Sequence, residues 1–454
     1  MSVQEKLIIK NFFTIKEFEW DVKGFNILTG GMASGKSLAL KLLCFCEQVF
    51  HQTIFETTIN KELFQKEKFF KKINEEFNAI FISRDHKSDY IDTVIDYSYK
   101  FYEHHSKLSN NQSELFDEET EEQLNQCFDL SASWDKTELR WSSKYIESKL
   151  EIWKTFFLEQ NTPELIERVR IRVFESISSD FFNSFPLDAM FIPASRAIAA
   201  ITNNIRSRDR FIQEFLYLKE YALSFNDHGG ISSEVVNTIL QFEDISLEDD
   251  KQPVFKLING RYVSSLELSS GQQELLYLLL LIDDLKRTNF TYGYHASIFI
   301  EEPSAHLFPR EQKETVEFLV TSFNELQKKK KHCPGHRFFI STHSPYLLNT
   351  INNLLEKDRL SRSIKNINNP EIKTTINNKI AELSFPFLSI DNVSAYMIEK
   401  NGNVTPMINN DDEPYIYSEI IDQISQEITE GTEKLYNLNN EIKKFIQPTE
   451  RTKK

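Results

Sequence analysis

The sequence has few cysteines, no C-x-x-C pair and no long hydrophobic segment. Its four cysteines are Cys44, Cys46, Cys127 and Cys333, and their spacing argues against a disulfide framework or a zinc site. A low cysteine content also suits a reducing compartment. The N-terminus lacks the apolar core and cleavage site of a signal peptide, and the longest apolar run, residues 275–282, is too short to span a bilayer. These absences predict a soluble, cytoplasmic protein with no membrane partner.

The sequence is also short of positive charge. It has 454 residues, of which 40% are hydrophobic, a net charge of −15 and a pI of about 5.3. An acidic chain is not expected to coat nucleic acid, although a local basic groove is compatible with this balance. The one notable basic run, residues 328–332, is either a solvated turn or a contact for DNA phosphates. The length and hydrophobic content predict two or three structural units with a buried core.

Glycine is scarce, and three of the 12 glycines lie together in the segment GGMASGKS, residues 30–37. This segment fits the pattern G-x-x-x-x-G-K-[ST], and it follows an apolar strand and precedes a helix, as a phosphate-binding loop does. A glycine turn before a helix is the alternative. In the first interpretation Lys36 reaches the β- and γ-phosphates of ATP and Ser37 binds Mg²⁺. The predicted nucleotide contacts of this loop are Gly30, Gly31, Ser34, Gly35, Lys36, Ser37 and Leu38.

A second apolar strand, residues 297–300, ends in two carboxylates, Glu301 and Glu302. Beside a phosphate-binding loop, such a strand end holds the metal and orients the attacking water. We therefore expect Glu301 to bind Mg²⁺ and Glu302 to polarise water. A third apolar strand, residues 338–341, leads to His343, which would contact the γ-phosphate. The alternatives are a solvated acidic strand end and a structural histidine.

The segment LSSGQQE, residues 268–274, opens an apolar helix. Its hydroxyls, its glycine amide and the helix N-terminus form a second anion site, and helix capping by Ser269 or Ser270 is the compatible alternative. The predicted contacts of this site are Ser269, Ser270, Gly271 and Gln272.

The order of these motifs resembles that of ABC-class ATPase heads, whose signature is LSGGQ, whose strand ends in DE and whose switch is a histidine. The runs IEEPSAHLFP and ISTHSPYLLN are similar to the RecF/OLD-like branch of bacterial AAA-family proteins (AAA_15/AAA_21 type). The resemblance covers residues 6–54 and 254–352. The sequence departs from the ABC-class pattern at two positions. Ser270 replaces a glycine of the signature, and Glu301 replaces the usual aspartate at the strand end. It contains no clear Q-loop.

The resemblance implies an α/β fold, an ABC-type P-loop NTPase head with a mainly helical insertion and a small C-terminal α+β extension. The head would comprise residues 1–59 and 253–360, the insertion residues 60–252 and the extension residues 361–454. Inside the insertion the sequence predicts strands at residues 79–83, 90–99, 139–141 and 189–193. Inside the extension it predicts a hairpin that turns at Asn401, Gly402 and Asn403, and a final helix over residues 415–446.

The resemblance also implies a partner. ABC-class heads pair head to tail, so Ser269 and Gly271 would act on ATP bound to the loop of a second copy, in a homodimer or higher oligomer. OLD-type proteins carry a TOPRIM nuclease after the ATPase, but no D-x-D follows His343 here. The chain therefore resembles the stand-alone ATPase subunits of anti-phage systems of the PARIS (AriA) and Septu (PtuA) types. These work with a separate TOPRIM-like or HNH-like nuclease.

Three functions stay open on the sequence alone. The first is an ATPase that senses a trigger, DNA or a phage protein, and controls a separate effector nuclease. The second is a RecF-like repair ATPase that binds DNA, although long heptads for a repair-type coiled coil are absent. The third is a transporter head, which would need a membrane partner and is disfavoured by the EEPSAHLFP run.

Overall fold

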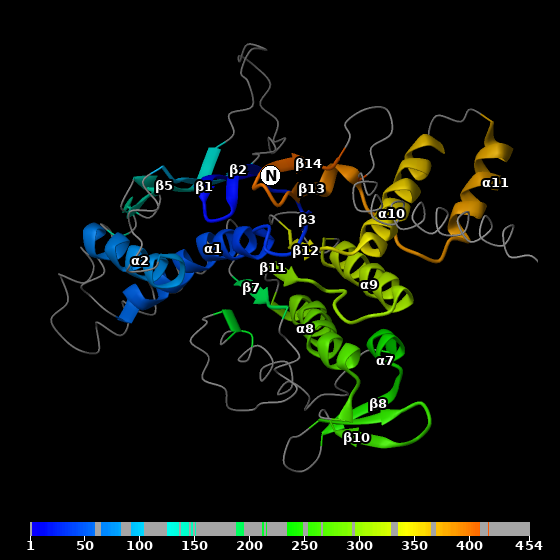
Figure 1. Cartoon of the computed structure of the whole chain (residues 1–454). Helices are drawn as coiled ribbons and strands as arrows, with labels where there is room; N and C mark the ends of the chain where they lie inside the picture. The colour runs from blue at the N-terminus through cyan, green and yellow to red at the C-terminus, as the bar shows by residue number, and fades with distance from the viewer. Residues whose placement is uncertain are drawn as a thin grey trace, which may run out of the picture.

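In the computed structural model of the protein, the described strands form three β-sheets with helices packed on them (Figure 1). The residues it describes are 2–59, 65–82, 92–103, 125–135, 138–144, 147–148, 150, 188–194, 211–212, 215, 234–247, 253–264, 267–292, 296–327, 335–364, 369–408 and 416. The predicted strand that leads into the phosphate-binding loop and the predicted helix that follows it are both present. The fold is mixed α/β, as expected.

A six-stranded, mostly parallel sheet lies at the centre, in the order β14-β13-β3-β12-β11-β7. Only β14 runs antiparallel to its neighbour. Every residue of β11 and β12 is buried, as expected for parallel strands that are covered on both faces. The strands are β3 (Phe25–Gly30), β7 (Asp188–Ile192), β11 (Ala296–Glu301), β12 (Arg337–Thr342), β13 (Val393–Ile398) and β14 (Val404–Pro406).

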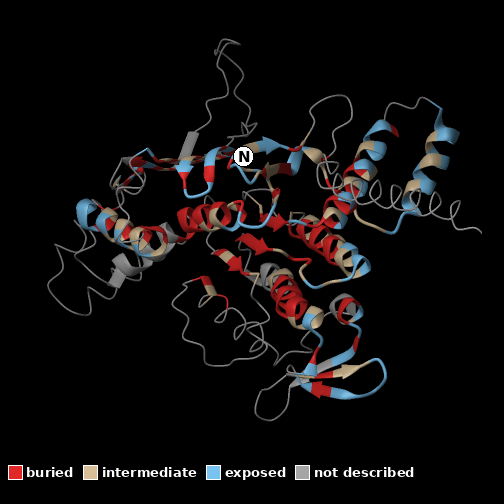
Figure 2. Cartoon of the chain, viewed as in Figure 1, coloured by how far each residue is buried: buried red, intermediate tan, exposed pale blue. Residues whose placement is uncertain are grey.

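Helices cover both faces of this sheet, and alternate residues along each strand supply the two cores. On one face, Phe339 stacks on Phe299 with ring centroids 4.2 Å apart, and both pack with α1. On the other face, Phe338 and Ile340 pack with α8, α9 and α10. Figure 2 shows the buried residues continuing from the strands into these helices. These helices are α1 (Lys36–Ile59), α8 (Ser270–Tyr292), α9 (Pro309–Gln327) and α10 (Pro345–Ser363). Helix α11 (Pro370–Ala381) lies against α10 and has no buried residue.

A five-stranded antiparallel sheet, in the order β2-β1-β4-β5-β6, shares the core of α1. Helix α2 (Lys66–Phe81) also packs there through four buried apolar residues that are spaced four apart. The strands are β1 (Ser2–Phe12), β2 (Ile15–Asp21), β4 (Val94–Glu103), β5 (Asn125–Asp135) and β6 (Glu138–Ser142). A small antiparallel sheet comprises β8 (Phe242–Leu247), β9 (Pro253–Leu257) and β10 (Tyr262–Ser264), preceded by α7 (Glu234–Leu240).

The structure differs from the sequence predictions at two strands. The strand predicted at residues 90–99 begins at Val94 and extends to Glu103, as β4. Residues 79–81 belong to α2 and not to a strand, because Phe69, Ile73, Phe77 and Phe81 share one buried helical face. Three described strands from the predicted insertion pair with strands of the predicted head, since β4 pairs with β1, β7 with β11 and β8 with β9. The predicted hairpin is present as β13 and β14.

Two further predictions lie outside the described residues, namely the basic run at 328–332 and, except for residue 416, the final helix at 415–446. Among the described helices, none is both long enough and apolar enough to cross a membrane.

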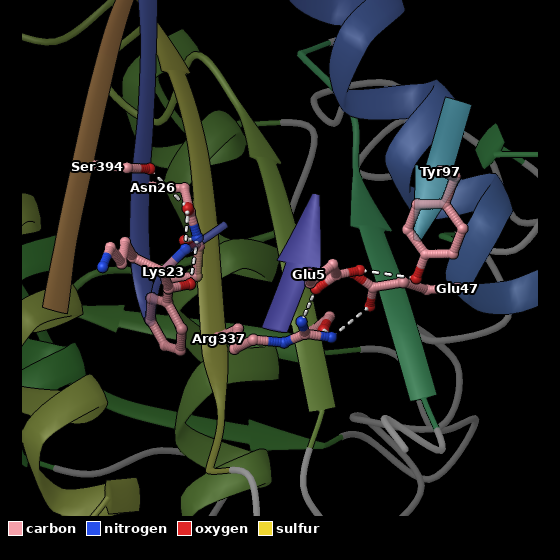
Figure 3. A network of polar contacts seen from close by, with 9 residues as sticks. Glu5, Lys23, Asn26, Glu47, Tyr97, Arg337 and Ser394 are labelled. Carbon is pink, nitrogen blue, oxygen red and sulfur yellow. Dashed lines mark hydrogen bonds and ion pairs between the residues drawn. The ribbon is translucent and has the colours of Figure 1, made fainter. Parts of the chain in front are cut away.

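A buried network of charges joins the two sheets (Figure 3). The guanidinium of Arg337, at the start of β12, contacts Glu5 of β1 and lies 3.1 Å from a carboxylate oxygen of Glu47 in α1. Arg337 also donates to Ser297 Oγ, at 2.9 Å, and Tyr97 Oη donates to Glu5, at 2.7 Å. Burial raises the pKa of Glu47 to about 8. Two carboxyl groups thus contact one cation, and burial favours the protonated form of Glu47 in the folded protein.

Candidate nucleotide-binding site

The predicted site residues lie at one edge of the central sheet. Strands β3, β12 and β11 are parallel neighbours, with Thr29 beside Thr342 and Ser341 beside Glu301. Their carboxyl ends therefore meet at the same edge, and the loops that follow them converge there. In open parallel sheets this edge is where ligands bind.

The phosphate-binding loop follows β3, and its glycines are required by its backbone. Gly30 has φ 142° and Gly35 has φ 110°, a region that residues with side chains rarely adopt. A Cβ atom at Gly30 would lie 2.2 Å from the carbonyl oxygen of Ile398, and one at Gly35 would lie 2.8 Å from Thr14 Oγ1. Ala33 is also left-handed, with φ 57°, which costs about 1–2 kcal/mol. The loop thus holds a strained conformation between the β1–β2 turn, at Thr14, and the end of β13, at Ile398.

The ammonium of Lys36 lies inside this loop. It donates to the carbonyl oxygens of Gly30 and Gly31, at 2.8 and 2.9 Å, and it lies 3.9 Å from Glu302 Oε1. Burial lowers the pKa of Lys36, while the carboxylates of Glu302 and Glu301 act in the opposite direction. A dehydrated ammonium is stabilised by a nearby anion, so this position suits a phosphate group.

The two carboxylates at the end of β11 have different partners. Glu302 has φ 45°, an unusual conformation for a residue that is not glycine. Its Oε2 accepts a hydrogen bond from the backbone N of His343, at 3.2 Å, and lies 2.8 Å from His343 Nδ1. Glu301 is buried and accepts from the backbone N of Ala194, at 3.1 Å. The structure therefore brings Lys36, Glu302 and His343 together.

The residues predicted to bind Mg²⁺ supply oxygen atoms only. Ser37 is exposed at the start of α1 and Glu301 offers one carboxylate, and Mg²⁺ prefers such hard donors. No group of three or more His, Cys, Asp or Glu residues suited to a metal occurs in the described part of the chain. The donor set fits an ion that is completed by water and nucleotide phosphates, which is the usual arrangement for Mg²⁺.

One buried hydroxyl in the loop also fits a phosphate ligand. The Oγ atom of Ser34 is buried and has no hydrogen-bond partner within the residues that the structure describes. A buried hydroxyl without a partner is costly. A phosphate oxygen beside Ser34 would satisfy it.

The segment that opens α8 is a capping box. Ser269 Oγ accepts a hydrogen bond from the backbone N of Gln272, at 3.3 Å, and Gln272 Oε1 accepts one from the backbone N of Ser269, at 3.1 Å. Ser269 is thus the capping residue, while Ser270 is exposed at the first helical position. No hydrogen bond joins residues 269–272 to residues 30–37 in the described structure. Gly271 packs on the loop that follows β11, since a Cβ atom there would lie 3.2 Å from the carbonyl oxygen of His306.

Two contacts of the loop were not predicted. Thr14, in the β1–β2 turn, donates through Oγ1 to the carbonyl oxygen of Ser34, at 3.1 Å. Lys400, in the β13–β14 hairpin, lies beside Gly31. Neither residue belongs to a local motif, so no pattern in the sequence indicates its position.

The sequence matches the family model described as an AAA ATPase domain over residues 3–348. No curated protein gives a significant match. Among solved structures, the chain is similar to the Smc head bound to the C-winged helix domain of ScpA, at 12% identity and a TM-score of 0.38, with 76% of this chain and 91% of that chain covered. It is also similar to the SMC head domain from Thermotoga maritima, at 13% identity and a TM-score of 0.34, with 77% and 92% covered.

The matched region contains every residue that the sequence analysis assigned to nucleotide or metal binding, from the loop at residues 30–37 to His343. It also spans most of the chain. The chain therefore belongs to the AAA ATPase domain family.

Proposed function

We propose that the protein binds ATP with Mg²⁺ at residues 30–37 and hydrolyses it. The observation that carries this proposal is the meeting of Lys36, Glu302 and His343 at the edge of the sheet. Lys36 binds the β- and γ-phosphates, which are more favourable partners than the carbonyl oxygens of Gly30 and Gly31 because they are charged. Bound Mg²⁺ would neutralise charge on the phosphates as the bond breaks.

In this proposal Glu302 orients and polarises the attacking water. Its carboxylate accepts from the backbone N of His343 and lies 3.9 Å from Lys36 Nζ, a position that supports a role beside the terminal phosphate. His343 contacts the γ-phosphate and reports its presence to α10, which begins two residues later. Such a carboxylate accelerates reactions by accepting a proton at the correct position.

We further propose that two copies assemble head to tail, with each ATP held between residues 30–37 of one copy and residues 269–272 of the other. Three large apolar side chains near the site support this arrangement. Met32 in the loop is 88% exposed, Phe308 after Glu302 is 78% exposed, and Tyr346 after His343 is 52% exposed. Apolar side chains that gather around one site are typical of a surface that a partner covers.

The biological role we propose is that of a sensor and scaffold that controls a separate effector nuclease in anti-phage defence. Two features of the sequence support it, namely the order of the motifs and the lack of D-x-D after His343. A nuclease gene beside this one, and co-purification of the two products, would favour it. Tight DNA binding with no associated nuclease would favour the RecF-like alternative.

Replacing Lys36 by alanine should weaken ATP binding by about 10- to 100-fold, because charge-assisted hydrogen bonds to the phosphates are lost. Isothermal titration calorimetry with ATP and Mg²⁺ measures this change. Lys23→Ala is a suitable control, since Lys23 lies before β3, at the opposite end of that strand. Equal affinities for wild type and Lys36→Ala would refute nucleotide binding at this loop.

A further inference from the structure

The β13–β14 hairpin places a lysine against the phosphate-binding loop. Strand β13 runs parallel to β3, and its last residue, Ile398, is paired with Gly30. Two residues later, Lys400 reaches the second residue of the loop. A Cβ atom at Gly31 would lie 3.3 Å from Cε and 3.7 Å from Cγ of Lys400. The side chain of Lys400 therefore lies alongside Gly31.

Backbone contacts hold the hairpin in this position. Gly402, with φ 87°, donates to the carbonyl oxygen of Glu399 at 3.0 Å, and its own carbonyl oxygen accepts from the backbone N of Lys16 at 2.8 Å. A Cβ atom at Gly402 would lie 2.2 Å from the carbonyl oxygen of Thr14. The hairpin thus packs closely on the same β1–β2 turn that bonds to the loop through Thr14.

The charge of Lys400 is not neutralised by its neighbours. The adjacent carboxylate, Glu399, accepts instead from Asn401 Nδ2, at 2.8 Å, and from Thr405 Oγ1, at 3.3 Å. Lys400 itself is exposed, and its ammonium makes no ion pair or hydrogen bond with the residues that the structure describes. An available cation therefore lies beside a loop whose backbone suits an anion.

We propose that Lys400 contributes a second positive charge to the polyphosphate of the bound nucleotide, which rests on the nucleotide binding proposed above. Lys36 and Lys400 both lie beside Gly31, because Lys36 Nζ donates to the Gly31 carbonyl oxygen and a Cβ atom at Gly31 would lie 3.3 Å from Cε of Lys400. Lys400 comes from residues beyond the matched domain, which ends at residue 348. Through it, the presence of nucleotide is linked to the position of the β13–β14 hairpin.

Calorimetric titration of the full chain with ATP, ADP and adenosine tests this proposal. Lys400→Ala should bind ATP and ADP about 3- to 10-fold more weakly than wild type, because a charged contact with phosphate is lost. Its affinity for adenosine should not change. Lys400→Arg should bind all three ligands as wild type does, and Lys379→Ala, an exposed lysine on α11, is the matched control. The difference between wild type and Lys400→Ala should shrink as salt is added.

Two results would overturn the role of Lys400. One is an unchanged affinity of Lys400→Ala for ATP, and the other is an equal loss of affinity for adenosine, which would indicate a change in the fold or the base contacts. These results differ from failure of the proposed function. If wild type binds ATP and Lys36→Ala does not, nucleotide binding at the loop stands, and only the contribution of Lys400 is then in question.

Discussion

Replacing Glu302 by glutamine should slow ATP hydrolysis by about 100- to 1,000-fold and leave ATP binding intact. Glutamine has nearly the same shape and keeps an oxygen that can accept from the backbone N of His343, at 3.2 Å in the native protein. Glutamine cannot take a proton from water. General-base catalysis of this kind accelerates a reaction by about 10²- to 10⁴-fold. Phosphate release under saturating ATP measures the change, and calorimetry measures the binding.

A carboxylate outside the site provides the control for this variant. Glu314 on α9 pairs with Arg310 at 3.0 Å, and Glu314→Gln should hydrolyse ATP at the wild-type rate. Removal of the negative charge 3.9 Å from Lys36 should also favour bound ATP, so the Glu302→Gln variant is expected to accumulate in its ATP-bound form. Wild-type turnover in Glu302→Gln would show that another group activates the water.

Replacing Arg337 by methionine should destabilise the protein by about 3–5 kcal/mol, because the buried carboxylate of Glu5 loses its cation and the carboxyl group of Glu47 loses its contact with the guanidinium. Glu5 and Glu47 have fully buried side chains, and both contact Arg337. The network joins β1, α1 and β12, so its loss should loosen the packing of the two sheets (Figure 3). Urea unfolding followed by circular dichroism measures the free energy of unfolding.

Two further variants separate this effect from a general cost of losing arginine. Arg310→Met removes an arginine whose side chain is 83% exposed, and it should cost less than about 1 kcal/mol. Arg337→Met combined with Glu5→Gln should regain part of the lost stability, since one buried charge fewer remains. Equal costs for Arg337→Met and Arg310→Met would show that the buried network contributes little.

The same network predicts a dependence of stability on pH. The pKa of Glu47 is about 8 in the folded protein, against 4.5 when it is exposed to water. Between these values the folded state holds a proton that the unfolded state has lost, so the contribution of Glu47 to stability falls as the pH rises from 4.5 to 8. Glu47→Gln should remove this decline. The variant should therefore gain stability over wild type at pH 8.5 and show little difference near pH 4.5.

The chemistry of the site could be predicted because it lies in short local patterns. The pattern G-x-x-x-x-G-K-S, the strand end at Glu301 and Glu302, and His343 after β12 each depend on a few neighbouring residues. Short continuous apolar runs predicted β3, β11 and β12 correctly. Convergence of these loops then follows from the parallel order of the strands.

The remaining features could not be predicted because they join distant parts of the chain. Glu301 bonds to Ala194, 107 residues away, and Arg337 contacts Glu5, 332 residues away. Neither partner belongs to a recognisable motif, and each is positioned only when β7 joins β11 or when β1 packs near β12. The strand predicted at residues 79–83 was wrong for a different, local reason, since the helical face of α2 extends to Phe81.

In the proposed head-to-tail assembly each ATP site is shared between two copies. Mixing two inactive variants tests this sharing most directly. Lys36→Ala disables the loop of its own chain. Ser270→Glu places a negative charge where the partner's ATP would bind, at an exposed helix N-terminus where glutamate favours folding.

Each variant alone should hydrolyse ATP slowly. An equal mixture should recover about a quarter of wild-type turnover, since half of the dimers are mixed and each has one intact site. Turnover in the mixture no greater than the average of the two variants would contradict the shared site.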